Sequence, residues 1–237
     1  MTGATEPLNP ADWPLERRIA VVVDTPGWFD PFSEALVDRL EKHGLTARLV
    51  RDYIDVPVGD IAFYLSCMKV TPPAILQRNT WNFVVHASDL PKGRGFSPIV
   101  WQILEGISQI PVTLIVMTEA VDAGDIVLRH TLNLEGNELN SAIRDALGRK
   151  VVEMCFEVAV EEHPPRLTPQ TGDATWYKRR TSLDSRLDPD LSLSAQFNLL
   201  RTVDNERYPA FFELHGRRFT LLINDVGPAL NKERDGK

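Results

Sequence analysis

Two residues with acid–base side chains stand at the ends of apolar stretches that have the length of β-strands. His86 closes residues 82–86, and Asp122 begins a D-A-G-D loop that follows residues 111–117. An imidazole can exchange a proton near neutral pH, and a neighbouring carboxylate can orient it. Each signal is weak alone, because a histidine at a strand end is often a packed residue and D-A-G-D is a common turn composition. Together, in this order, they favour catalysis, provided that the fold brings the two stretches together.

Apolar strands and helical stretches alternate over most of the chain. Residues 19–23 form a continuous apolar run, which is the pattern of a strand covered on both faces. The alternation predicts an α/β fold with a doubly wound, mostly parallel sheet, whose ligands bind beyond the carboxyl ends of the strands. Further strands are expected at residues 47–50, 61–65, 82–86 and 111–117, and helices at residues 32–44, 72–78, 97–106 and 139–162.

The remainder of the chain is expected to add a small C-terminal helix and β-hairpin. Residues 163–190 are polar and contain prolines, which predicts a surface excursion, and a short helix is expected at residues 193–203. A hairpin is expected at residues 210–223, with Gly216 supplying the positive φ of its turn. We predict a catalytic domain at residues 18–190 and a small helix–hairpin subdomain at residues 191–225. Residues 1–17 are expected to form an irregular arm, and the tail after residue 224 is expected to fray.

The charge and composition exclude several classes of protein. Among 237 residues, 26 lysines and arginines stand against 33 aspartates and glutamates, and the net charge of −7 argues against a nucleic-acid partner. No apolar run approaches the roughly 20 residues of a membrane helix, and the N-terminus lacks a signal pattern, so we expect a cytoplasmic protein without a membrane partner. Cys67 and Cys155 have no C-x-x-C spacing, which fits a reducing compartment and predicts no metal site.

The residues around His86 follow an ordered pattern. After His86 come Ser88, Leu90-Pro91, Gly95 and Pro98, and Asp122-Ala123-Gly124 follows the next strand. This pattern resembles the formyltransferase superfamily that uses 10-formyltetrahydrofolate. In that family a strand ends in N-x-H, S-x-L-P and a proline-started helix follow, and a D-x-G loop comes later. The likeness extends over residues 18–223 and is greatest to short bacterial amino-sugar N-formyltransferases, which share the C-terminal helix and hairpin.

The resemblance implies a reaction and a set of site residues. An amine attacks the formyl group of N10-formyltetrahydrofolate, His86 stabilises the oxyanion or moves the proton, and Asp122 orients His86. The folate is expected against the loop of residues 66–72 and the region before Asp122, and its candidate contacts are Met68, Val70, Ser88, Thr118 and Val121. The acceptor amine is expected against an aromatic and basic cluster and two flanking loops, and its candidate contacts are Trp28, Tyr177, Arg179, Arg180, Asp184 and Arg207. Without the resemblance, that cluster reads equally well as a solvated basic turn.

One position departs from the family pattern. The asparagine of N-x-H falls on Val84, which cannot donate a hydrogen bond to an oxyanion. Asn82 points to the same face of the strand, but it lies four residues before His86, which is about 13 Å at the strand rise. Either another donor substitutes, with Ser66, Lys69, Ser88 or a backbone N–H as the options, or the activity is reduced or altered.

Three functions remain open at this point. The first is formylation of an amino sugar, nucleotide-linked or free, for a surface glycan, with N10-formyltetrahydrofolate as co-substrate. The second is formylation of another amine, such as hydroxyornithine or methionyl-tRNA. The tRNA version is disfavoured by the net charge and by the short segment after residue 223. The third is a folate- or sugar-binding homologue in which Val84 marks lost chemistry. We predict a homodimer because the hairpin carries apolar residues and open edges.

Overall fold

The computed structural model describes residues 13–14 and 16–228, so the predicted N-terminal arm up to residue 12 and the tail from residue 229 lie outside the described residues. Where the arm is described it packs against the core, because the Trp13 side chain is buried edge-on against the Trp81 ring.

The helices are α1 (Asp30–Lys42), α2 (Pro73–Leu76), α3 (Pro98–Leu104), α4 (Asn140–Val160) and α5 (Phe197–Thr202), with short 3-10 turns η2 (Tyr53–Asp55) and η3 (Ser182–Ser185). The strands are β1 (Arg18–Val22), β2 (Thr46–Val50), β3 (Gly59–Tyr64), β4 (Asn79–His86), β5 (Arg94–Gly95), β6 (Gln109–Val116), β7 (Ile126–Asn133), β8 (Trp176–Tyr177), β9 (Ala210–Leu214) and β10 (Arg217–Leu221).

The central sheet has six strands in the order β2-β1-β3-β4-β6-β7. The first four are parallel, whereas β6 and β7 are antiparallel to their neighbours. The predicted mostly parallel α/β sheet is confirmed. The edge strand β7 was not predicted, because its burial is partial along most of its length and its polar residues interrupt the apolar pattern.

The two faces of the sheet are covered differently. On one face α1 and α4 pack together over the larger core, in which Leu36, Leu40 and Met154 are fully buried against strand residues such as Phe63 and Phe83. Burying each such side chain contributes about 1.5–3 kcal/mol. The opposite face carries a smaller core around α2, with Val22, Ala62 and Tyr64 from the strands and Ile75 from the helix. Because side chains alternate along a strand and Tyr64 lies beside Val84 in register, Val84 and His86 face this smaller core.

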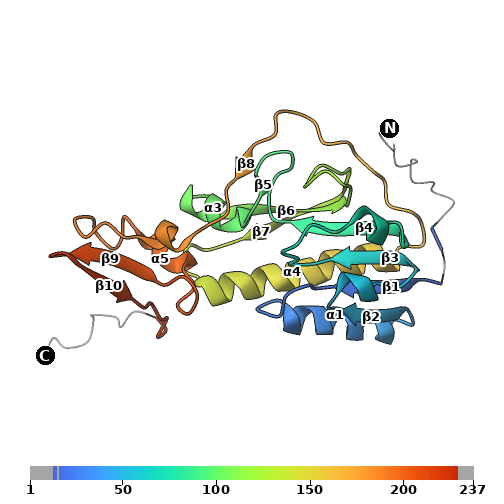
Figure 1. Ribbon diagram of the computed structural model, residues 1–237, viewed down its shortest axis with the longest axis horizontal. Helices are drawn as coiled ribbons and strands as arrows, with labels where there is room; N and C mark the ends of the chain where they lie inside the picture. Colours follow the sequence, from blue (N-terminus) through green and yellow to red (C-terminus); the bar gives the residue numbers. More distant parts are fainter. Residues whose placement is uncertain (1–12, 15, 229–237) are drawn as a thin grey trace, which may run out of the picture.

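The segment after α4 returns over the sheet, and we call residues 168–177 the strap. Thr168 pairs with Ile126 at the start of β7, and β8 pairs with β5 in parallel. Figure 1 shows the segment arching over the sheet between α4 and β8. Residues 163–190 do run along the surface, as predicted, but the strap is bonded to two loops rather than being a free excursion.

The C-terminal helix and hairpin form as predicted. Strands β9 and β10 are antiparallel, and their turn is made by His215 and Gly216, both at positive φ. A small cluster of buried side chains joins them to α5, and it consists of Leu187, Leu200, Val203 and Ala210. Figure 1 shows the hairpin at one end of the long axis, on the side toward which β3 points. The domain boundary at residues 190/191 stays a prediction.

Candidate functional site

His86 lies at the carboxyl end of β4 with both ring nitrogens near acceptors. Its Nε2 is 2.8 Å from the carbonyl oxygen of Gly93, and its Nδ1 is 3.5 Å from Oδ1 of Asp122. The His86 side chain is only 8% exposed and that of Asp122 only 12%. A ring with a proton on each nitrogen would donate to both neighbours, whereas a ring with one proton leaves one nitrogen facing an acceptor unpaired.

Asp122 is held in a strained backbone conformation that aims its carboxylate at His86. Its φ is +52°, in the left-handed region that non-glycine residues rarely adopt. Oδ2 accepts a hydrogen bond of 2.8 Å from the backbone N–H of Gly95. Gly124 is required two residues later, because a Cβ there would lie 1.7 Å from the carbonyl oxygen of Val116. The D-x-G spacing therefore sets the shape of the loop that presents the carboxylate, and the predicted pairing of Asp122 with His86 is seen.

The strap fixes the two loops that carry this pair. Gln170 donates from Nε2 to the carbonyl oxygens of Asp122 (2.9 Å) and Gly124 (2.8 Å), and its Oε1 accepts from Arg94 at 2.7 Å. Thr175 accepts from the backbone N–H of Gly93 through its hydroxyl at 2.8 Å. These are side-chain bonds across more than forty residues, so the geometry of the site depends on a segment remote in sequence.

The structure narrows the choice of oxyanion donor, because it excludes the side-chain amide of Asn82. Asn82 is unsuitable, as predicted, because its amide donates to the carbonyl oxygens of Leu76 and Asn79 at 2.8 and 3.0 Å. Val84 is half-buried and offers no donor. Of the alternatives, Ser66 is exposed at a positive φ of 53°, while the Ser88 hydroxyl is buried and has no hydrogen-bond partner among the described residues.

The loop after β3, residues 66–72, lies beside the carboxyl end of β1. The Met68 and Val70 side chains are 54% and 74% exposed, so the loop is open to a ligand. The Cys67 thiol is packed inward, 3.4 Å from the carbonyl oxygen of Val22, and burial raises its pKa to about 11. It is therefore a small packed group rather than a reactive thiol.

The region before Asp122, residues 118–121, is exposed to solvent. Thr118 and Val121 are both exposed, and the Thr118 hydroxyl donates to the carbonyl oxygen of Ala120 at 3.0 Å. The folate contacts named for Met68, Val70, Ser88, Thr118 and Val121 stay predictions.

The basic cluster predicted for the acceptor is partly engaged within the protein. The Tyr177 hydroxyl donates to Glu105 at 2.8 Å, and burial raises the pKa of Tyr177 to about 12. Asp184 accepts from Lys178 and from Thr181, and these hydrogen bonds lower the pKa of Asp184 to about 2. Tyr177 and Asp184 thus make hydrogen bonds that hold residues 177–184 in place.

The two arginines of this cluster differ. Arg179 is exposed and lies over the Phe96 ring at 4.5 Å, with no acidic partner in the described part of the chain. Arg180 donates to the carbonyl oxygen of Asp184 at 3.0 Å, and burial lowers its guanidinium pKa. Arg179 is therefore the more accessible anion-binding group.

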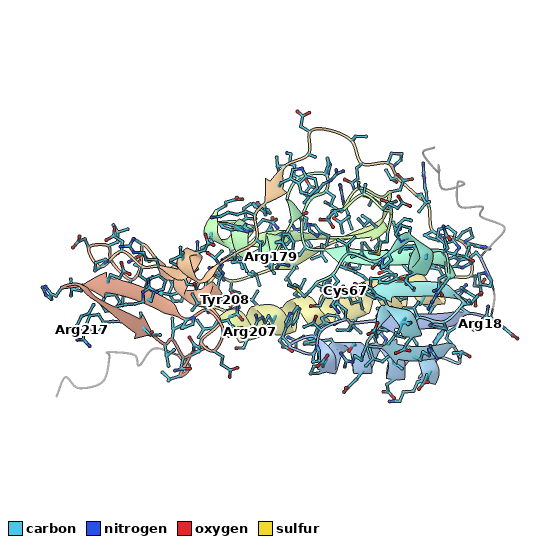
Figure 2. The ribbon with its side chains drawn as sticks, viewed as in Figure 1. Arg18, Cys67, Arg179, Arg207, Tyr208 and Arg217 are labelled. Atoms are coloured by element: carbon cyan, nitrogen blue, oxygen red, sulfur yellow. The ribbon has the colours of Figure 1, made fainter. Side chains whose placement is uncertain are left out.

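Two further acceptor candidates lie in separate loops. Arg207 is exposed beside Tyr208. Figure 2 shows both residues near the middle of the long axis of the molecule, where Arg179 and Cys67 also lie. Trp28 is half-buried against Phe29, and the Arg144 guanidinium lies 5.9 Å from its ring. The roles of all six acceptor residues stay predictions.

Sequence reasoning missed the residues that support the site. Gln170 and Thr175 lie in a segment without an apolar pattern, and their partners are mostly backbone atoms, so no motif marks them. Asp24 is a single acidic residue after β1, and its strongest contacts are backbone N–H groups. Within the described ranges, no group of three or more metal-binding side chains is arranged to hold an ion. None of the described helices combines the length and apolar content needed to cross a membrane.

The comparison with known families agrees with this geometry. The protein-family model described as "Formyl transferase" matches residues 27–158, which is more than half of the chain. The chain belongs to the formyl transferase family. A methionyl-tRNA formyltransferase of Synechococcus sp. (strain JA-3-3Ab) is 28% identical over 182 residues, covering 75% of this chain and 55% of that protein. The chain spans about half the length of the curated relatives it matches.

Solved structures share the fold. A methionyl-tRNA formyltransferase from Clostridium thermocellum superposes with a TM-score of 0.75 at 21% identity, covering 89% of this chain and 94% of that one. A 4-N formyltransferase from Francisella tularensis gives a TM-score of 0.65 at 16% identity, covering 89% and 98%. The expected formyltransferase fold is confirmed by these likenesses.

Proposed function

We propose that the protein transfers a formyl group from N10-formyltetrahydrofolate to the primary amine of an amino sugar, nucleotide-linked or free. The observation that carries the proposal is the buried His86–Asp122 pair at the carboxyl end of β4, held in place by Gly95 and the strap. Family membership supports the reaction class. The pairing of a histidine with a carboxylate supplies the proton transfer that amide exchange requires.

The reaction is a displacement at the formyl carbon. The neutral acceptor amine forms a bond to that carbon, and the carbonyl oxygen becomes an oxyanion. The nitrogen of the acceptor loses a proton, which the Asp122 carboxylate relays to N10 of the folate as the bond between the formyl carbon and N10 breaks. His86 donates to the oxyanion from Nε2 in place of its contact with the Gly93 carbonyl, and Asp122 stabilises the charged ring.

The acceptor proposal rests on the chemistry of the basic cluster. The exposed guanidinium of Arg179 over the Phe96 ring suits a phosphate or carboxylate attached to a ring. Methionyl-tRNA is the second candidate, because the curated relatives bear that name. The net charge of −7 argues against RNA, since phosphate contacts normally need many spread lysines and arginines. The third candidate is a catalytically impaired homologue, in which Val84 in place of the family asparagine marks the loss of activity.

The homodimer is proposed from the open edge of the hairpin. One side of β9 is covered by a bridge between Arg186 and Phe211, whereas β10 has no such neighbour in the described residues. Two β10 strands paired antiparallel about Phe219 would place Arg217 and Arg218 opposite uncharged residues. That arrangement removes the open edge without opposing like charges.

The function is tested by tetrahydrofolate release from N10-formyltetrahydrofolate with a panel of amines. The panel contains nucleotide-linked amino sugars, free amino sugars, hydroxyornithine and methionyl-tRNA. Turnover with an amino sugar, lost in His86→Asn, supports the proposal. Turnover with methionyl-tRNA alone would replace the acceptor, and folate binding without turnover on any amine would favour the impaired homologue.

A further inference from the structure

Asp24 has a set of contacts that the proposed reaction does not use. It follows β1, and its carboxylate accepts hydrogen bonds from the backbone N–H of Met68 at 2.9 and 3.0 Å and from that of Lys69 at 2.9 Å. The hydroxyls of Thr25 and Tyr53 lie 3.0 and 3.1 Å from it. Burial alone would raise the pKa of Asp24, but these hydrogen bonds hold it below its ordinary value. Asp24 is thus an ionised group that binds the loop of residues 66–72.

Tyr53 ties a third element to the same point. Its hydroxyl lies 2.8 Å from the carbonyl oxygen of Lys69 as well as beside Asp24. Burial raises the pKa of Tyr53, so the phenol keeps its proton and remains a donor. The end of β1, the η2 turn and the loop after β3 therefore meet at one carboxylate.

These contacts decide which backbone groups of the loop remain free. The N–H of Met68 and both backbone groups of Lys69 are occupied. The carbonyl of Met68 and the N–H of Val70 have no hydrogen-bond partner among the described residues, and their side chains are exposed. A free acceptor and a free donor two residues apart suit a heterocycle that presents both kinds of group on one edge, as a pterin does.

We propose that Asp24 is a positioning residue that holds this loop in the shape that binds the pterin of N10-formyltetrahydrofolate. The inference rests on the proposed function. Asp24 does not touch the reacting atoms, and it acts through Met68 and Lys69. An asparagine at this position would turn an N–H₂ group toward those backbone N–H groups and release the loop.

The test is calorimetric titration of tetrahydrofolate into the wild-type protein, Asp24→Asn and a matched control, Asp60→Asn. Asp60 also accepts a backbone N–H, that of Arg18 at 2.8 Å, and hydrogen bonds from Arg18 lower its pKa against the effect of burial. It lies near the start of β3, at the end of that strand opposite to the loop of residues 66–72. We expect the Kd of Asp24→Asn to rise about tenfold to a hundredfold, and that of Asp60→Asn to stay within about twofold. In turnover, KM for the co-substrate should rise while kcat at saturation is kept.

The outcomes separate the inference from the proposed function. Absence of tetrahydrofolate binding by the wild-type protein would overturn the function and the inference with it. Wild-type binding with an unchanged Kd in Asp24→Asn, or an equal loss in Asp60→Asn, would overturn the inference alone. If Asp24→Asn does not fold, Tyr53→Phe serves instead, because it removes the hydroxyl that donates to the carbonyl oxygen of Lys69. An unchanged Kd for tetrahydrofolate in Tyr53→Phe would equally overturn the inference.

Discussion

Replacing Asp122 with asparagine is expected to lower kcat by about two to three orders of magnitude while leaving the fold intact. The carboxylate lies 3.5 Å from Nδ1 of His86, and both side chains are about nine-tenths buried. Two unit charges at that distance attract by about 5 kcal/mol at an effective dielectric constant of about 20. Burial of both groups offsets part of this. Because each 1.4 kcal/mol is about a factor of ten, the loss of charge beside the imidazolium gives the expected range.

The assay is steady-state turnover with saturating co-substrate, with Asp125→Asn as the control. Asp125 lies three residues along the same loop, and its carboxylate has no hydrogen-bond partner in the described part of the chain. We expect Asp125→Asn to keep kcat within about threefold, because the substitution removes no hydrogen bond made by the side chain among the described residues. Near-native kcat in a folded Asp122→Asn variant would refute the role of the carboxylate. An equal loss in both variants would show that the loop, not the charge, is the sensitive feature.

Three further substitutions and one labelling experiment have defined outcomes. Val84→Asn restores the family donor two residues before His86 and should raise kcat by about tenfold or more, with an unchanged or lower rate as the contrary result. Gln170→Ala removes two bonds to the Asp122 loop and should reduce kcat with little change in co-substrate KM, so a pure KM effect would contradict it. Cys67, with its pKa raised to about 11, should resist iodoacetamide at neutral pH in the native state and react as pH rises toward that value, whereas rapid native labelling at neutral pH would disagree. Phe219→Glu should give a monomer by light scattering if the wild-type protein is a dimer through β10, and an unchanged dimer would place the interface elsewhere.

The sequence could locate His86 and Asp122, the proposed catalytic pair, because each is marked by residues close to it in the chain. His86 directly ends a strand whose apolar run is evident, and the D-x-G loop needs Gly124 for the close approach to Val116. Parallel strand ends do not explain the pairing, because β6 runs antiparallel to β4, and it is the loop after β6 that carries Asp122 back to His86. The fold class follows from the same alternation of apolar runs.

The supporting contacts could not be predicted because their partners are backbone atoms far away in the chain. Thr175 bonds to Gly93 across 82 residues, and Gln170 bonds to the carbonyl oxygens of Asp122 and Gly124. Polar residues in an irregular segment have no period that would indicate such contacts. The edge strand β7 was missed for a related reason, since partial burial weakens its pattern.

The most direct test of the central claim is mass spectrometry of the acceptor after incubation with N10-formyltetrahydrofolate labelled in the formyl carbon. We expect an amino sugar to gain the mass of one labelled formyl group with the wild-type protein and not with His86→Asn. No labelled product from any amino sugar, or equal labelling by both proteins, would contradict the account of His86 and Asp122 as the centre of an amino-sugar N-formyltransferase.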